Sequence, residues 1–306
     1  MISILMATYN GEEYLIEQLE SLLAQTFDDF VIYVNDDCST DKTWEILNSY
    51  AQKYPSKIKI TRRNENSGSA KHTFLELMVR VRDNYIMLCD QDDVWLTDKI
   101  EVTLSKMREV ERGSSGAVLV YTDLRIVDWN LKLINSSYQD FMQSDFERTE
   151  LNQVLIQSIF AGCTAMYNRA LAELLSEVPD YCVAHDWWLL LVASAFGEIS
   201  YVDKPTILYR QHEKNEVGTR NIRRASYKLK MALQGSRIKN AIYVTYEQAK
   251  CFLKIYKNYL DENQRRMLER YCAIPSMKKL ERLRIIHELG AYKIGFSRNV
   301  AYFLFV

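Results

Sequence analysis

The sequence is poor in the residues that form flexible linkers and covalent cross-links. Its 306 residues include only 10 glycines and 4 prolines, with no low-complexity tract or internal repeat, so we expect no long linker. The six cysteines are scattered and form no C-x-x-C pair. This spacing argues against a disulfide framework or a zinc site and favours free thiols in a reducing compartment.

Long hydrophobic runs are missing as well. The longest run, residues 187–196, has ten residues and is too short to span a bilayer. The segment MISILMATYN begins a strand without a basic leader, so we expect no secretory signal. We therefore expect a cytoplasmic protein, or one that rests on the inner face of the plasma membrane.

The chain does have ample apolar residues and a strong charge asymmetry. Hydrophobic residues make up 48% and aromatic residues 12%, enough for one large domain with an appendage. The net charge of -1 hides two regions of opposite sign. Residues 220–306 hold 19 Lys and Arg against 6 Asp and Glu, a charge of +13, which leaves -14 for residues 1–219. The two regions therefore have different electrostatic tasks.

Strands alternate with helices along the first 122 residues. The pattern predicts strands at 2–8, 30–35, 58–61, 85–89 and 117–122, and helices at 12–25, 41–53, 70–80 and 96–110. This alternation predicts a parallel, doubly wound α/β sheet. Ligands bind such sheets beyond the carboxyl ends of the strands.

The pattern is less regular between residue 122 and residue 220. Strands are expected at 121–127, 131–134 and 163–167, with a final pair at 199–202 and 207–209 around Pro205, and helices at 149–157, at 169–177 and from His185. From residue 220 onward the pattern is helical. Apolar residues recur at helical spacing from Ile222 to Leu233, from Phe252 to Tyr259 and from Leu280 to Leu289.

Three polar clusters follow predicted strands of the first part. They are Thr8-Tyr9-Asn10, Asn35-Asp36-Asp37 and Asp90-Gln91-Asp92-Asp93. The carboxyl ends of parallel strands share one edge of a sheet, so the clusters should converge on one crevice. Carboxylates this close repel one another and lose solvation, so a positive group should lie nearby. A solvated acidic turn before the next helix is the alternative for residues 90–93.

The ordered motifs carry a family resemblance. TYNGEEYLIEQLESLLAQT, VNDDCSTDKT, NENSGSA and CDQDDVW resemble the inverting nucleotide-sugar glycosyltransferases of family 2, and the likeness continues through FAGCTAMYNRAL, AHDWWLLL and YRQHEKN. HDWW followed by RQHxxN is most similar to bacterial rhamnosyltransferases that build cell-wall or capsular polysaccharide. The resemblance implies a glycosyltransferase-A fold, a Rossmann-like mixed α/β sheet flanked by helices, in a catalytic domain at 1–217. Residues 218–306 would form a basic amphipathic helical C-terminal region.

The resemblance also implies a divalent cation, Mg²⁺ or Mn²⁺, at the acidic motif. Asp92 would be the main metal ligand, and Asp90 would face the ribose or share the metal. A cation there can neutralise the charge that develops on a diphosphate leaving group. His212 would complete the metal shell, with a purely structural role as the alternative, and Arg210 would contact the diphosphate. Asp93 would either accept a hydrogen bond behind the metal or cap the next helix.

Further motif residues are expected to bind the nucleotide sugar. In the family, an aspartate of the Asp36-Asp37 motif accepts a hydrogen bond from the pyrimidine N3–H; a helix N-cap cluster is the alternative. Gly68 would let backbone approach phosphate at a helix N-terminus with Lys71 one turn later, although an ordinary strand–helix connection is equally open. The predicted nucleotide-sugar set also includes Thr8, Tyr9, Asn10, Asn66 and Gln91; for Tyr9, simple packing is the alternative.

A direct displacement needs a base for the acceptor hydroxyl, whose pKa is high. Asp186 stands where family members place a catalytic aspartate, so the resemblance assigns it as general base, with helix capping as the alternative. Trp187 and Trp188 would offer flat faces to sugar rings, and His185 would orient or close the site. Gly162 lies in a segment that resembles the family's pocket lining, although a small residue there would also suit core packing.

The basic C-terminal region suits a membrane surface. Basic amphipathic helices bind anionic lipid headgroups, and the final NVAYFLFV adds an apolar anchor too short to span. Packing against the catalytic domain is the alternative, and a homodimer stays open. Nucleic acid is not expected, because no recognised binding motif accompanies the charge.

The expected function is inverting, metal-dependent sugar transfer from a nucleoside-diphosphate sugar. The donor would be dTDP-L-rhamnose and the acceptor a lipid-linked saccharide in polysaccharide synthesis. A UDP-hexose or UDP-N-acetylhexosamine donor on the same fold is the alternative. A catalytically silent nucleotide-sugar-binding subunit is the alternative from another class, against which the acidic motif and the candidate base both argue.

Overall fold

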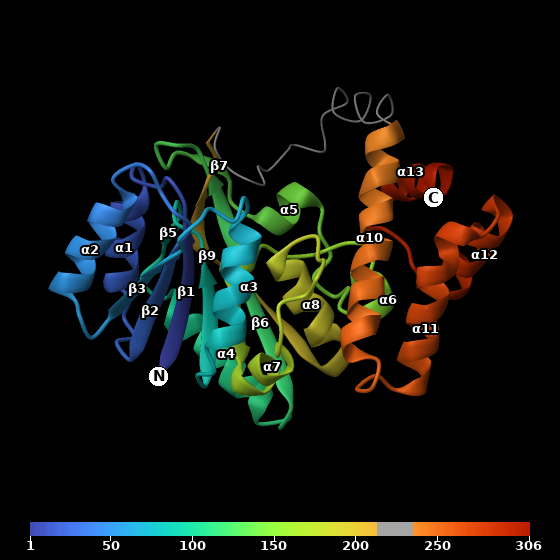
Figure 1. Ribbon diagram of the computed structural model, residues 1–306, viewed down its shortest axis with the longest axis horizontal. Helices are drawn as coiled ribbons and strands as arrows, with labels where there is room; N and C mark the ends of the chain where they lie inside the picture. The colour runs from blue at the N-terminus through green and yellow to red at the C-terminus, as the bar shows by residue number, and fades with distance from the viewer. Residues whose placement is uncertain (213–234) are drawn as a thin grey trace. The chain divides into compact units, whose positions relative to one another are not determined.

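The computed structural model describes residues 1–212 and 235–306, which group into two compact units (Figure 1). The first unit comprises Met1–Tyr138, Ala161–Val178 and the described residues from Gly197 to His212. The second comprises Gln139–Phe160, Pro179–Phe196 and the described residues from Gly235 onward. The predicted apolar repeat from Ile222 to Leu233 lies outside the described residues.

Among the described residues, nine strands form one mixed sheet in the first unit. They are β1 (Ile2–Thr8), β2 (Phe30–Asp36), β3 (Ile58–Arg62), β4 (Tyr85–Cys89), β5 (Val94–Trp95), β6 (Ala117–Val127), β7 (Leu133–Asn135), β8 (Ala165–Asn168) and β9 (Gly197–Arg210). Their order is β3-β2-β1-β4-β8-β6-β9-β5, with β7 paired to β6. Strands β1 to β4 are parallel, as predicted, but β8 runs antiparallel between β4 and β6, so the sheet is mixed.

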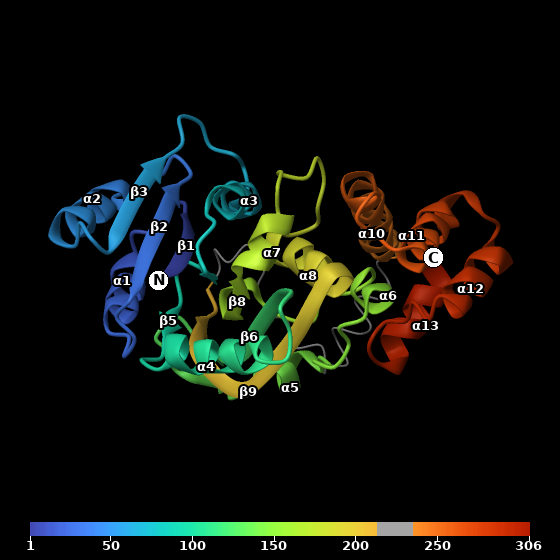
Figure 2. The same cartoon turned by 90° about the horizontal axis from the view of Figure 1, so that it is seen from below.

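Among the described residues, helices of the first unit cover both faces of this sheet, and further helices form the second unit. The α-helices are α1 (Leu15–Leu23), α2 (Thr43–Lys53), α3 (Ala70–Arg80), α4 (Lys99–Glu111), α5 (Tyr138–Met142), α6 (Leu151–Val154), α7 (Arg169–Leu174), α8 (His185–Phe196), α10 (Gly235–Tyr256), α11 (Glu262–Ala273), α12 (Lys279–Glu288) and α13 (Phe296–Phe305), with 3₁₀ turns η1 (Gly162–Thr164) and η2 (Ile274–Ser276). Helices α1 and α3 lie on opposite sides of β1 and β2 (Figure 2). Helix α4 packs on β6 and β9.

The central strands are buried along their length, which explains their apolar composition. Every residue of β1 is buried, as is typical of a parallel strand covered on both faces. Thr8 is in register with Asp36, and Met6 with Cys89. The loops that follow β1, β2 and β4 therefore leave the sheet at the same edge.

Two elements differ from the sequence prediction. The expected strand pair around Pro205 is one strand, β9, because Pro205 lies at a register shift opposite Asp123, where a missing N–H is tolerated. The helix expected from residue 96 begins at Lys99, because residues 94–95 pair with β9 as strand β5.

Helix α8 packs on α10 within the second unit. Trp188 is 1% exposed, and its ring centroid lies 5.6 Å from that of Phe252 and 6.1 Å from that of Tyr256. The half-buried Trp187 instead donates its indole N–H to the Val154 carbonyl at 2.7 Å. Adjacent helical residues point about 100° apart, so the two rings serve different contacts. Among the described helices, none is both long and apolar enough to cross a bilayer.

Candidate active site

Asp36, the last residue of β2, is buried and connects neighbouring segments at the sheet edge through hydrogen bonds and an ion pair. Its Oδ1 accepts hydrogen bonds from the hydroxyls of Thr8 and Ser39. Its Oδ2 accepts the Ser39 backbone N–H at 3.0 Å and pairs with Arg62 Nε at 3.2 Å. A carboxylate has about four acceptor positions, so these partners use all of them. Recognition of a base by Asp36 stays a prediction.

Asp37 connects the same edge to the loop before α3. Its Oδ1 accepts the Ser67 backbone N–H at 2.9 Å and pairs with Arg63 Nε at 3.1 Å. Its Oδ2 accepts the Ser67 hydroxyl at 2.7 Å and the Asn66 amide at 3.3 Å. Asp37 is 2% exposed, so a buried carboxylate holds the loop before α3 in place.

The turn into α3 has the geometry expected for a glycine-dependent connection. Gly68 is exposed and has a φ of +78°, a conformation that favours glycine. Ser69 caps α3, because its hydroxyl accepts the Lys71 backbone N–H at 3.2 Å. One N–H of the helix N-terminus is therefore already used by the protein, and phosphate binding there stays a prediction.

Gln91 fixes the chain just after β1. Its Oε1 accepts the Tyr9 N–H at 2.9 Å, and its Nε2 donates to the Tyr9 carbonyl at 3.0 Å. A Cβ added at Gly11 would lie 2.3 Å from Gln91 Oε1, so this contact needs glycine. Asn10 has a φ of 47° and its Oδ1 accepts the Thr40 N–H at 2.8 Å. The Tyr9 side chain is 46% exposed at this ordered edge.

The structure brings Asp92 and His212 together across 120 positions of sequence. His212 Nε2 lies 2.8 Å from Asp92 Oδ2. The imidazole also stacks on Tyr14, with ring centroids 4.7 Å apart and an interplanar angle of 28°. Carboxylate oxygen and imidazole nitrogen are both suitable ligands for Mn²⁺, and oxygen is the ligand that Mg²⁺ prefers. The two residues predicted to share a metal are thus neighbours.

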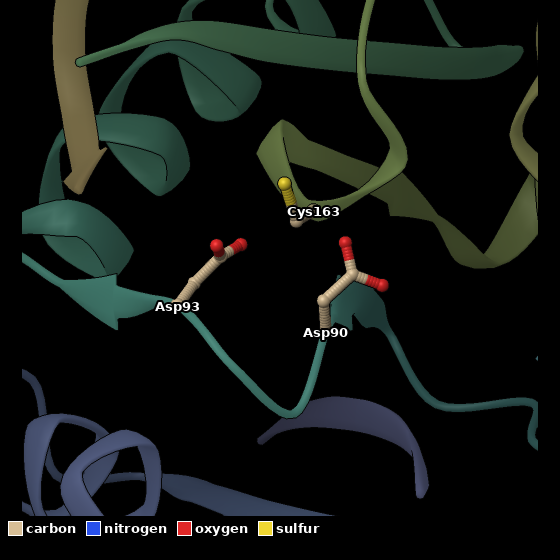
Figure 3. A group of neighbouring side chains, drawn as sticks. All are labelled: Asp90, Asp93 and Cys163. Atoms are coloured by element: carbon tan, nitrogen blue, oxygen red, sulfur yellow. The ribbon is translucent and has the colours of Figure 1, made fainter. Parts of the chain in front are cut away.

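A second group of potential ligands lies beside this pair. The loop after β4 and the turn η1 bring Asp90, Asp93 and Cys163 together (Figure 3), with one ligand atom of each within 4.8 Å of the others. Asp93 is fully buried; burial, followed by the charges of Asp92 and Asp90, raises the pKa of its carboxyl well above the usual range. The thiol is a softer ligand than Mg²⁺ or Mn²⁺ favours, so these ions fit Asp90, Asp92 and His212 better. Asp93 does not cap α4, which begins six residues later at Lys99.

Arg210 holds the acidic loop from the end of β9. The residue is 2% exposed, and its guanidinium donates to the carbonyls of Asp92 at 2.9 Å and Trp129 at 2.7 Å and pairs with Glu17. Its backbone N–H donates to Asp93 Oδ1 at 3.1 Å. The side chain therefore binds groups of the protein itself, and a contact with diphosphate stays a prediction.

The sequence pattern did not predict Lys99 as part of this site. Its side chain is fully buried, its Nζ has no hydrogen-bond partner among the described residues, and it lies 4.6 Å from the Trp95 ring centroid. Burial lowers the pKa of Lys99 to about 8, against the opposing effect of Cys163, Cys89 and Asp93. As the first residue of a helix, Lys99 gives no sequence signal of burial. Arg210 is the positive group that contacts the acidic loop, and Lys99 is a second buried cation near Cys163, Cys89 and Asp93.

The candidate base belongs to the second unit. Asp186 lies in the first turn of α8, half-buried, and its Oδ1 accepts the Trp187 backbone N–H at 2.7 Å. His185 and Trp187 are also half-buried, whereas Gly162 is buried in η1 of the first unit. Trp188 packs in the core of the second unit, so the expectation that its face meets a sugar is wrong.

Comparison with known proteins places these residues in a family context. The family model described as glycosyl transferase family 2 matches residues 3–175. The chain is 32% identical over 237 residues to dTDP-rhamnosyl transferase RfbG of Shigella flexneri, a match that covers 73% of this chain and 77% of that protein. It is 30% identical over 205 residues to chondroitin synthase of Escherichia coli, covering 67% of this chain but 28% of that protein.

Solved structures are similar in fold. S. aureus TarS 1–349 in complex with UDP-GlcNAc has a TM-score of 0.58 at 17% identity, covering 99% of this chain and 89% of that chain. The mannosyltransferase PcManGT of Pyrobaculum calidifontis, in complex with GDP-Man and Mn²⁺, has a TM-score of 0.53 at 14% identity, covering 94% and 79%. These likenesses confirm the expected glycosyltransferase-A fold with a C-terminal helical region.

We expect Lys99→Met to stabilise the protein at neutral pH. Because the pKa of Lys99 is about 8 in the folded state and about 10.4 when unfolded, the unfolded chain holds more protons between these values, and stability rises with pH there. The free-energy cost of burying the charged ammonium is fully present below about pH 8. Lys99→Met should therefore gain about 3 kcal/mol of stability at about pH 7 and little at about pH 10.

Urea unfolding at both pH values measures this difference. Lys106→Met, on the same helix but with its ammonium paired to Glu109 at 2.7 Å near the surface, is the matched control and should show no such pH-dependent gain. A Lys99→Met protein that is less stable than wild type by the same amount at both pH values would contradict the claim that burial of the charged Lys99 costs stability.

Proposed function

The chain belongs to glycosyl transferase family 2, and on this premise we propose that it transfers L-rhamnose from dTDP-L-rhamnose to a lipid-linked saccharide. Glycosyl transfer itself follows from the family, and the silent binding subunit is set aside. The observation that carries the donor is the likeness to dTDP-rhamnosyl transferase RfbG, which extends over most of both chains. A lipid-linked acceptor would place the reaction at the inner face of the plasma membrane, in cell-wall or capsular polysaccharide synthesis.

A UDP-hexose or UDP-N-acetylhexosamine donor is the second candidate. S. aureus TarS, which is similar in fold, was solved in complex with UDP-GlcNAc, but at 17% identity this similarity supports the fold alone. We favour rhamnose because the match to the dTDP-rhamnosyl transferase RfbG has 32% identity over most of both chains.

Asp92, His212 and Asp90 would hold Mg²⁺ or Mn²⁺, which when bound would neutralise charge on the departing diphosphate. The contact of 2.8 Å between His212 and Asp92 supports this set, because both side chains already face one point. Arg210 donates to the backbone carbonyl of Asp92 and so holds the backbone from which the Asp92 carboxylate projects. The protein thus orders its ligands before substrate arrives, which is how such sites gain affinity.

The nucleotide would lie along the edge formed after β1, β2 and β4. The exposed ring of Tyr9 and the half-buried Asn10 are available to a base there. Thr8, Asp36 and Asp37 are buried, so we assign them first the task of shaping the loops that meet the base. The predicted phosphate-side contacts are Asn66, Gly68 and Lys71, of which Asn66 and Gly68 are exposed, and Gln91 stays a predicted nucleotide-sugar contact.

Asp186 would take the proton of the acceptor hydroxyl as it attacks the anomeric carbon. The bond from the Trp187 N–H supports this role, because it orients the carboxylate at the start of α8. The half-buried His185 and Trp187 would line the acceptor side. Attack from the face opposite the leaving diphosphate inverts the anomeric configuration.

A panel of nucleotide sugars tests the donor. Initial rates of donor hydrolysis or transfer with Mn²⁺ should favour dTDP-L-rhamnose over UDP-glucose, UDP-galactose and UDP-N-acetylglucosamine by about tenfold or more in kcat/KM. Turnover of UDP-hexoses with dTDP-rhamnose ignored would contradict the rhamnosyl assignment and leave the family assignment intact.

The base is tested by Asp186→Asn, which keeps the shape of the side chain and removes the proton acceptor. Transfer should fall by about 10²–10⁴-fold while dTDP affinity stays close to that of wild type. Asp180→Asn is the matched control in the same unit, because Asp180 is a surface residue paired with Lys254. Unchanged transfer by Asp186→Asn would remove Asp186 from this role.

A further inference from the structure

Helix α13 presents an apolar stripe to solvent. Phe296, Val300 and Leu304 are spaced four residues apart, so they lie on one face of the helix. Their exposed fractions are 87%, 41% and 67%. Tyr302, on the opposite face, is 1% exposed and forms part of the core of the second unit. The helix therefore packs through one face and leaves an apolar face exposed among the described residues.

Positive side chains gather at the C-terminal end of this stripe. Lys279 Nζ donates to the carbonyls of Phe303, Leu304 and Val306 at 2.6, 2.9 and 2.9 Å, which places a cation at the end of α13. Burial lowers the pKa of Lys279, and the nearby charges of Arg282 and Lys239 lower it further. These cations are close enough to repel one another.

Helix α12 has a further exposed apolar side chain in its first turn. Leu280 directly follows Lys279 in the chain and is 83% exposed. Single exposed leucines are ordinary on protein surfaces, but apolar side chains gathered beside cations mark an interaction surface. We name Phe296, Val300, Leu304, Lys279 and Lys239 the α13 surface.

We infer that the α13 surface docks on an anionic lipid bilayer, with α13 lying in the interface plane and its stripe at the acyl boundary. The ten residues of α13 are about 15 Å long, which suits a helix that lies on a membrane. Charge complementarity supports this occupant, because the described residues 235–306 hold 14 Lys and Arg against 6 Asp and Glu. The inference depends on the proposed function at one point only: a lipid-linked acceptor would explain why the enzyme docks on a membrane.

A second copy of the chain fits this surface less well. A symmetric contact would bury Lys239 and Lys279 of both copies in an interface where the α13 surface offers no carboxylate to pair with them. Nucleic acid fits the cations alone and would leave Phe296 and Leu304 in water. An anionic bilayer satisfies both parts of the surface, since headgroups meet the cations and acyl chains meet the stripe.

The test is co-sedimentation of the full chain with vesicles of phosphatidylcholine alone or mixed with phosphatidylglycerol, without donor or acceptor. Wild type should bind the mixed vesicles and little of the neutral ones. The double variant Phe296→Ser with Leu304→Ser should bind about tenfold more weakly. Lys239→Gln should bind a few-fold more weakly and with less salt dependence.

Tyr259→Ser is the matched control. Tyr259 is 68% exposed and lies past the end of α10, roughly 33 Å along that helix from its first residue, Gly235. The ring of Phe305, in α13, lies against Gly235, so Tyr259 is remote from the α13 surface. Tyr259→Ser should bind as wild type does, and unchanged thermal unfolding of every variant confirms that each is folded.

Three results would overturn the inference. They are equal binding by wild type and the double serine variant, equal binding to neutral and anionic vesicles, and no binding by wild type. A concentration-dependent dimer that the double serine variant loses, without vesicle binding, would assign the surface to a second copy. The assay contains no sugar donor, so its failure leaves the proposed transfer untouched, and failure of transfer leaves vesicle binding to be judged separately.

Discussion

The buried guanidinium of Arg210 is the interaction on which the candidate site depends. It joins the end of β9 to the loop after β4 through the Asp92 carbonyl, to the loop after β6 through the Trp129 carbonyl and to α1 through Glu17. Its backbone N–H meets the buried carboxyl of Asp93. Because three carboxylates follow β4 directly, this loop would repel itself without a fixed positive neighbour. With Arg210 in place, β9 ends two residues before His212, which reaches Asp92.

Much of the fold follows from local sequence. Strands β1 and β4 and helix α3 have the predicted bounds, because buried parallel strands are uninterrupted apolar runs and Ser69 provides a helix cap. The pairing of Asp92 with His212 follows from the order of motifs, which the family resemblance supplied and no periodicity in the chain could show. The single strand β9 was missed because a proline usually ends a strand, and here a bulge accommodates it.

The remaining features depend on contacts between distant segments. Trp187 and Trp188 are indistinguishable by type, and only the packing of α8 on α10 shows that Trp188 is core. The burial of Lys99 and the contacts of Asp36 with Thr8 and Arg62 are likewise set by neighbours far away in sequence. The predicted division after residue 217 rested on charge and motif order, whereas the second unit also includes residues 139–160 and 179–196. The sequence also could not show that one apolar face of α13 is left exposed by the described residues.

The central claim is that the carboxylates around Asp92 bind a nucleoside diphosphate through a divalent cation. Calorimetric titration with dTDP, in the presence and absence of Mn²⁺, tests it most directly. The account predicts that Mn²⁺ tightens dTDP binding by about tenfold or more, that Asp92→Asn removes this gain, and that Asp98→Asn, a surface residue paired with Lys204, keeps it. Equal dTDP affinity with and without Mn²⁺, or a gain that survives Asp92→Asn, would contradict it.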